Sequence, residues 1–128
     1  SYHNYINIFL EEKALKKQVM SIVTDSLPLE APKDPDTCNV FALYKLLGNT
    51  DQVADMRANY IAGGFGYGHA KTALLEILME TYDVQRAAYN GWMKDLASLD
   101  AELALGAEKA RSVGGETLRR VRGALGLD

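Results

Sequence analysis

Apolar residues recur at spacings of three and four along most of this chain, and alternation with a period of two is almost absent. The first pattern is typical of amphipathic helices, whereas half-buried strands require the second. The three prolines, Pro28, Pro32 and Pro35, lie close together in one connector. The sequence therefore predicts an all-α fold, a helical bundle of about five helices.

The first predicted helix runs from residue 11 to about residue 24, with Leu15, Val19 and Ile22 on its apolar face. Residues 25–33 contain two prolines and are predicted to form a linker. The next four residues, 34–37, read Asp-Pro-Asp-Thr. Acidic and hydroxyl side chains of this kind accept hydrogen bonds from free backbone amides, so we expect them to cap a second helix.

The second and third predicted helices are separated by Gly48 and by the potential caps of residues 49–52. The inward residues of the second helix are Val40, Tyr44 and Leu47, and those of the third are Val53, Met56 and Tyr60. We expect Tyr44, Tyr60 and the later Trp92 to belong to the core rather than to bind nucleotides.

Two long helices are predicted next, over residues 68–94 and 99–125. Their apolar seams are Ala70, Leu74, Ile77, Thr81, Val84, Ala88 and Trp92 in the first, and Leu103, Ala107, Ala110, Gly114, Leu118, Val121 and Leu125 in the second. The short connector favours antiparallel packing of the two helices. Gly114 and Gly115 are predicted to form a kink or weak point, since an interior glycine costs about 1 kcal/mol relative to alanine.

The composition is typical of one soluble domain: 128 residues, 48% of them hydrophobic, without the long apolar run of a membrane span. A single cysteine, Cys38, fits a reducing compartment, and no export signal opens the chain. We therefore expect a cytoplasmic protein that does not enter a membrane.

The net charge of −3 comes entirely from residues 34–98, which hold eight acids and five bases. The segments on either side are each neutral. Affinity for phosphate follows the local field, so an acidic chain can still bind RNA where cations gather.

The His and Cys residues of this chain do not have the spacing of a metal site or of a catalytic nucleophile and its base. His3 and His69 are far apart in sequence, and Cys38 has no Cys or His at a ligand spacing, so we expect no metal site and no catalytic cysteine. The glycine-rich run of residues 63–68 precedes Lys71, yet His69 and Ala70 intervene where a Walker loop requires glycine next to lysine.

Two interpretations of the glycine run remain open. It can be only a helix C-cap and tight turn in which glycines supply positive φ. It can also present the free amides of the following helix, together with Lys71, Phe65 and Tyr67, to a single-stranded RNA loop.

Three strings in this chain resemble the tryptophanyl-tRNA synthetases of bacteria: DPDTCNVFALYKLL at residues 34–47, GGFGYGHAK at residues 63–71, and the opening Ser1-Tyr2-His3-Asn4. In that family the ATP-activating KMSKS loop runs into a Ser-Tyr-x-Asn segment. The resemblance therefore implies a C-terminal fragment that begins at the last serine of the loop, with Ser1 as a remnant and not a catalytic residue.

The resemblance implies two segments. Residues 1–33 would hold the loop remnant, first helix and linker, and residues 34–128 the helical anticodon-binding domain of a class I aminoacyl-tRNA synthetase. The parent enzyme, implied to be a homodimer, attaches tryptophan to its tRNA using ATP with Mg. The fragment lacks the N-terminal catalytic Rossmann domain and is expected to be inactive alone, with no cofactor of its own.

The implied partner is the anticodon region of tryptophan tRNA, whose anticodon is CCA. Position and charge select Arg57, Tyr67 and Lys71 as candidate tRNA-binding residues around the glycine run, and Arg111, Arg119 and Arg122 along one side of the last helix. The arginines of the last helix can equally form a solvated flank whose stems cover apolar surface. The alternative function is a non-enzymatic helical adaptor whose apolar seams bind protein.

Overall fold

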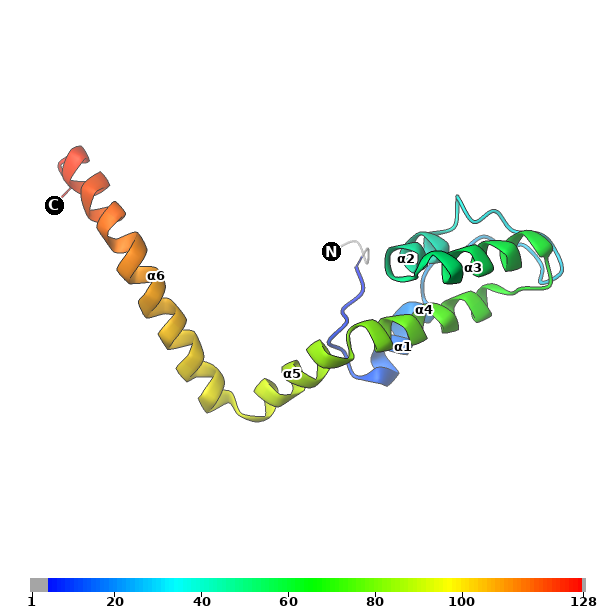
Figure 1. The fold of residues 1–128 in the computed structure, drawn as a ribbon, viewed down its shortest axis with the longest axis horizontal. Coiled ribbons are helices and arrows are strands. Elements are labelled where there is room, and N and C mark those ends of the chain that lie inside the picture. The colour runs from blue at the N-terminus through cyan, green and yellow to red at the C-terminus, as the bar shows by residue number, and fades with distance from the viewer. Residues whose placement is uncertain (1–4, 128) are drawn as a thin grey trace. The chain divides into compact units, whose positions relative to one another are not determined.

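The computed structural model describes residues 5–127, and these residues form six α-helices and no strand (Figure 1). The helices are α1 (Glu12–Met20), α2 (Asn39–Leu47), α3 (Thr50–Ala62), α4 (Tyr67–Thr81), α5 (Asp83–Lys94) and α6 (Leu96–Leu125). The all-α prediction is confirmed. The predicted Ser1 remnant and His3 lie outside the described residues.

The chain forms two compact units, one ending at Arg86 and the other beginning at Ala87. The boundary at residue 33 between a loop remnant and an anticodon-binding domain is a functional division, and it stays a prediction. None of the described helices has the length and apolar character needed to cross a lipid bilayer.

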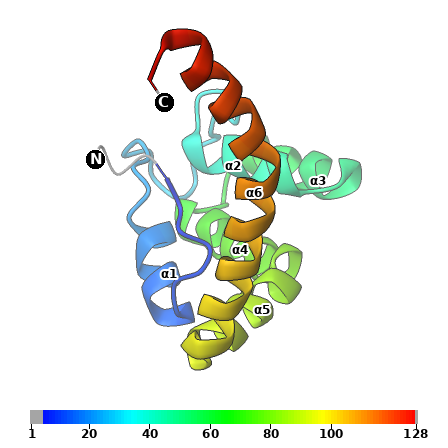
Figure 2. The ribbon, with the colours of Figure 1, turned by 90° about the vertical axis from the view of Figure 1, so that its left-hand side faces the viewer.

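Helix α4 is the centre of the first unit. It packs against α1 on one side and α2 on another, and α3 packs on α2 (Figures 1 and 2). The buried apolar side chains are Leu15, Val19, Cys38, Val40, Phe41, Tyr44, Met56, Tyr60, Ala70, Leu74, Leu75, Ile77 and Leu78. Most of these positions lie on the seams predicted by helical periodicity, and Tyr44 and Tyr60 are in the core as expected.

Two predicted helix boundaries in the first unit are wrong. Helix α1 ends at Met20 rather than near residue 24, because Ser21 turns the chain with its own N–H and hydroxyl bonded to the last carbonyls. Residues 34–37 do not cap α2, whose N-cap is Cys38. The Asp34 carboxylate accepts instead from the Asp36 N–H at 2.9 Å, which fixes a turn before the helix.

The predicted cap of α3 is confirmed. The Asn49 side chain accepts from the Gln52 N–H, and the Gln52 side chain accepts from the Asn49 N–H, both at 2.9 Å. This reciprocal capping box satisfies two amides that the first helical turn leaves without partners.

The predicted helix over residues 68–94 is in fact two helices that meet at Tyr82. The break coincides with the end of burial: α4 contributes five buried residues, whereas α5 contributes none. Val84 and Trp92 of the predicted seam are 76% and 42% exposed. The expectation that Trp92 belongs to the core is therefore wrong.

The second unit has no described side chain that is fully buried. Its helix α6 begins at Leu96, three residues earlier than predicted, where the Asp95 carboxylate accepts from the Ser98 N–H at 3.1 Å. Within this unit α5 and α6 do not pack along each other, because Asp95 alone separates them and an antiparallel return needs a longer connection. Helix α6 continues through Gly114 and Gly115 as one element.

Tyr60, fully buried at the end of α3, is surrounded by aromatic rings and one thiol. Its ring lies 5.5 Å from that of Phe41, 5.9 Å from Phe65 and 6.1 Å from Tyr67, measured between centroids. Its hydroxyl contacts the Cys38 sulfur at 3.4 Å. This ring joins the starts of α2 and α4 to the end of α3.

Stability should fall as the pH rises above about 10, the usual pKa of a phenol in an unfolded chain. Burial, followed by the contact with Cys38, raises the pKa of Tyr60 above that value in the folded state. Above pH 10 the unfolded chain then binds fewer protons than the native one, so the free energy of unfolding decreases. Urea unfolding of wild type and Tyr60→Phe between about pH 9 and about pH 11 should give a shallower decrease for the variant. If the unfolding free energy of both proteins fell equally with pH, the raised pKa of Tyr60 would not be the cause.

Candidate nucleic-acid interface

The turn between α3 and α4 is built on two glycines with positive φ, Gly63 at 76° and Gly64 at 74°. A β-carbon on Gly63 would lie 2.4 Å from the carbonyl oxygen of Glu30, so the linker covers this residue directly. The Gly64 N–H donates to the Leu29 carbonyl at 3.0 Å. The predicted C-cap and tight turn are confirmed, and the turn is packed against the linker.

Lys33 fastens the linker to this turn. Its side chain is buried, and the ammonium donates to the carbonyls of Pro28, Leu29 and Ala31 at 3.1, 3.1 and 2.9 Å. Its backbone N–H donates to the Tyr60 carbonyl at 2.7 Å. All three donors of the ammonium thus have acceptors, which is the condition for burying such a charge.

Tyr67 is the first residue of α4 and is half-buried between the linker and the core. The Lys33 ammonium lies 5.5 Å from its ring centroid, within the range of a cation–π contact, and the Tyr60 ring approaches edge-on. Burial and then a hydrogen bond with the Asp25 carboxylate raise the pKa of Tyr67. Because Lys33 lies over the ring, we assign Tyr67 to a pocket wall rather than to an open stacking face.

A small pocket of mixed polar and apolar lining lies beside Tyr67, between the start of the linker and the start of α2. We call it the linker pocket; its volume is about 360 Å³, and it is lined by Val23, Thr24, Asp25, Thr37, Cys38, Asn39 and Tyr67. The Asp25 carboxylate also accepts from the Leu27 N–H at 3.0 Å, which fixes its position.

Arg57, a predicted tRNA-binding residue, is engaged within the protein. Two of its guanidinium nitrogens donate to the two carboxylate oxygens of Asp36, one of them at 3.0 Å, and the group lies 5.1 Å from the Phe41 ring centroid. The hydrogen bond with Arg57 lowers the pKa of Asp36. The pair joins α3 to the turn before α2.

Lys71 is also engaged. Its ammonium donates to the Met20 carbonyl at 3.0 Å and so satisfies one of the free carbonyls at the end of α1. The remaining candidates, Arg111, Arg119 and Arg122, are exposed on α6 in the second unit. Arg122 donates to the Leu127 carbonyl at 2.9 Å, close to the end of that helix.

Sequence reasoning missed most of the linker pocket. Asp25 lies in a segment predicted only as a linker, and Thr37 in one predicted only as a helix cap. The proximity of the linker to Tyr67 is a tertiary contact across more than thirty residues of chain, for which no local pattern exists. The one signal in the sequence was a lysine and an aspartate among prolines, a rigid context that can fix polar side chains.

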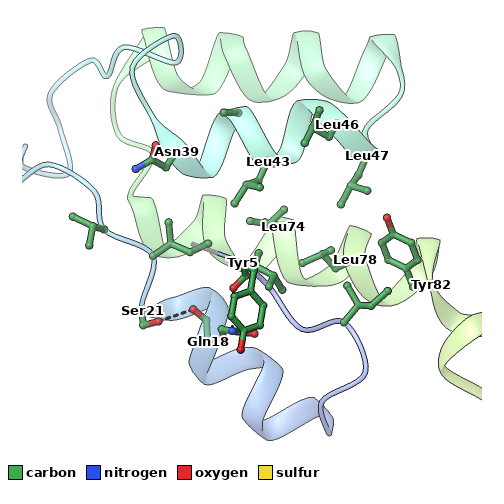
Figure 3. Close-up of a pocket in the computed structure, with 15 residues that line it drawn as sticks. Tyr5, Gln18, Ser21, Asn39, Leu43, Leu46, Leu47, Leu74, Leu78 and Tyr82 are labelled. Atoms are coloured by element: carbon green, nitrogen blue, oxygen red, sulfur yellow. Dashed lines mark hydrogen bonds between the residues drawn. The ribbon is translucent and has the colours of Figure 1, made fainter. Parts of the chain in front are cut away.

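A larger apolar groove, with a volume of about 990 Å³, adjoins the linker pocket, with which it shares Val23 and Asn39 (Figure 3). Its walls come from α1, α2, α4 and residues 5–8, with Leu43, Leu47, Leu74 and Leu78 lining it. The Gln18 side chain holds the extended segment beside α1 by donating to the Tyr5 carbonyl at 3.1 Å and accepting from the Asn7 N–H at 2.9 Å. Among the described residues, no cluster of three or more His, Cys, Asp or Glu could hold a metal ion.

The chain is similar to tryptophan–tRNA ligases of several bacteria. The chain is 42% identical over 127 residues to a tryptophan–tRNA ligase of Fusobacterium nucleatum, and 40% identical over 127 residues to one of Campylobacter jejuni. Both alignments cover 99% of this chain. The resemblance to tryptophanyl-tRNA synthetases is confirmed. No family model matches the chain.

A solved tryptophanyl-tRNA synthetase from Campylobacter jejuni has the same fold over 98% of this chain, with a TM-score of 0.87 and 40% identity. A second structure of that protein, complexed with ADP and tryptophan, matches with a TM-score of 0.86. The chain spans about 40% of the length of these tryptophanyl-tRNA synthetases and corresponds to their C-terminal helical part.

The two turn glycines should respond differently to substitution. Gly64→Ala should cost about 1–2 kcal/mol of unfolding free energy, because alanine is strained at positive φ but finds open space. Gly63→Ala should cost more, because its methyl group would also collide with the Glu30 carbonyl. Gly68→Ala, in open space within α4, is the matched control and should not destabilise. Urea unfolding of the three variants measures the order of their unfolding free energies. Equal losses of unfolding free energy for Gly63→Ala and Gly64→Ala would show that the linker does not pack against the turn.

Proposed function

We propose that this chain is the tRNA anticodon-binding part of a tryptophan–tRNA ligase, an enzyme that attaches tryptophan to its tRNA using ATP. The observation that carries the proposal is the continuous similarity to tryptophanyl-tRNA synthetases over 99% of the chain. The partner is the anticodon region of tryptophan tRNA.

The first unit offers suitable chemistry for such a partner. Sequence-specific proteins recognise single-stranded RNA mainly through hydrogen bonds to base edges and through aromatic contacts, since the bases of a loop are splayed out. The linker pocket combines a carboxylate, an amide, hydroxyl groups and an aromatic wall. Recognition of this kind does not require a positive net charge.

The chemical steps belong to the part of the enzyme that this chain does not contain. The glycine turn does not suit ATP, because Gly64 donates its N–H to the linker and the linker covers Gly63. We therefore place the ATP and Mg site in a separate N-terminal catalytic domain and propose that this chain alone is inactive. A cytoplasmic, homodimeric parent enzyme completes the proposal.

Arg57, Tyr67, Lys71, Arg111, Arg119 and Arg122 are the proposed tRNA-binding residues. Arg57 and Lys71 keep N–H donors beyond those used in their internal bonds, since guanidinium has five and ammonium three. Their contacts with RNA phosphate would add to their structural roles.

Binding of an anticodon stem-loop tests the function. The chain should bind a stem-loop carrying CCA more tightly than one with a changed anticodon, and the affinity for both should fall as salt rises because phosphate contacts release counterions. Fluorescence anisotropy at two salt concentrations measures both effects. A protein-binding adaptor, for which the apolar groove is the supporting observation, predicts equal and negligible binding to the two RNAs.

Loss of one cation should affect tRNA binding and not amino-acid activation. In the full-length enzyme, Lys71→Ala should raise the KM for tRNA about fivefold, the value of a partly solvated charge contact. ATP–pyrophosphate exchange should be nearly unchanged. Lys45→Ala, an exposed lysine on α2, is the control and should change neither. A collapse of exchange in Lys71→Ala would show that this side chain has another role.

A further inference from the structure

The extended segment of residues 5–10 packs every second side chain against the core of the first unit. Ile6, Ile8 and Leu10 are half-buried on the core cluster, whereas the residues at positions 5, 7 and 9 are exposed. An extended backbone gives this alternation when one of its faces is covered. Apolar packing of this kind holds the segment on the unit but is not directional, so other contacts must fix its register.

Gln18 of α1 binds one edge of this segment as a neighbouring strand would. Its side-chain amide donates to the Tyr5 carbonyl (Figure 3) and accepts from the Asn7 N–H. In an extended backbone these two groups, on either side of Ile6, point to the same edge. A shift of the segment by one residue would turn both groups to the opposite edge, so this single amide fixes the register.

Arg86 binds the same segment from a different helix. It lies in the first turn of α5, and its half-buried guanidinium donates to the Ile8 carbonyl. A hydrogen bond from a charged donor is roughly twice as strong as one between neutral groups. Since α5 contributes no buried residue of its own, this bond ties its first turn to the segment.

Asn7 then turns the chain from the segment toward α1. Its side-chain oxygen accepts from the Phe9 N–H at 3.1 Å, and its carbonyl accepts from the Leu10 N–H at 3.2 Å. The end of a domain is usually poorly ordered unless it is tied down. Here the backbone is tied at residues 5, 7 and 8 by Gln18 and Arg86, which we call the junction clamp.

The junction clamp lies where the two parts of the proposed enzyme meet. The chain corresponds to the C-terminal part of its relatives, so the N-terminal catalytic domain precedes Tyr5 in the proposed parent enzyme. A tRNA held at its anticodon by this chain must also place its acceptor end in that domain. A fixed junction keeps the two sites at a constant spacing, which raises the effective concentration of the second contact and the fraction of bound tRNA aligned for reaction.

We propose that Gln18 and Arg86 are positioning residues for the attachment of tryptophan to tRNA. By clamping residues 5–8, they fix the orientation of the N-terminal catalytic domain relative to the helical first unit. Both act through the backbone of this segment and touch no substrate. This role rests on the proposed function and adds no contact with RNA.

Aminoacylation kinetics of the full-length enzyme test the junction clamp. Gln18→Glu keeps the size of the side chain and the acceptor for Asn7, but it places a carboxylate oxygen against the Tyr5 carbonyl. Arg86→Ala removes the bond to Ile8. Each variant should lower kcat about tenfold, because less of the bound tRNA is aligned with the catalytic domain. The KM for tRNA should stay within about twofold, because the anticodon contacts are retained.

Two further variants show whether the effect belongs to the hydrogen bond. Arg86→Lys keeps a charged donor and should recover part of the kcat that Arg86→Ala loses. Gln85→Ala changes an exposed residue next to Arg86 on α5 and is the matched control, so its kcat and KM should equal those of the wild type. If Arg86→Ala and Gln18→Glu also kept the wild-type kcat, the proposal would be overturned.

Energy transfer between two dyes measures the orientation without any reaction. In the full-length protein one dye is placed at the N-terminus and the other on Asp51→Cys, an exposed position in the first turn of α3. Single molecules with an intact junction clamp should give one narrow distribution of transfer efficiency. Gln18→Glu and Arg86→Ala should broaden it, whereas Gln85→Ala should not.

The outcome for the junction clamp is distinct from the outcome for the proposed function. If the affinity of the full-length variants for the CCA stem-loop falls together with kcat, Gln18 and Arg86 only support the fold and the proposal fails. If the wild type attaches tryptophan to tRNA and the variants keep its kcat, the clamp fails and the proposed function stands. If the wild type lacks this activity while the variants broaden the transfer distribution, the proposed function fails and the clamp still orients the two domains.

Discussion

Buried Lys33 holds together two segments that the local sequence leaves independent. It bonds to three carbonyls of its own linker, and its backbone N–H bonds to the end of α3. A charge without these acceptors would be too costly to bury, so the linker has to fold back on itself around the lysine. The folded linker then covers Gly63, and Asp25 and Tyr67 line the same pocket.

This constraint changes the interpretation of the positive residues near the glycine turn. Arg57 and Lys71 were selected by their charge and position, and the structure gives both an internal partner. The linker pocket adds small polar side chains that also keep acceptors or donors. Under the proposed function, hydrogen bonds to base edges would contribute to recognition in the first unit, which agrees with a chain whose net charge is −3.

The second unit illustrates the limit of an apolar seam as a predictor. The spacing of Leu103, Leu118 and Val121 identifies one face of α6, and all three side chains are at least 48% exposed. Periodicity shows that a helix has an apolar face, but it does not say which surface covers that face. Most helical stability in proteins comes from packing of such a face, so the partner of α6 matters more than its propensity.

The sequence by itself determined the helical class, the core faces of the first four helices, the capping box of α3 and the positive-φ glycines, and its strings identified the family. These features depend on side-chain period and on backbone sterics, which act over a few neighbouring residues. Tertiary structure alone decided the break at Tyr82, the internal partners of Arg57 and Lys71, and the pocket formed by Asp25, Asn39 and Tyr67. Each of these results from contacts or burial between distant segments, and the local pattern of residues carries no record of which segments meet.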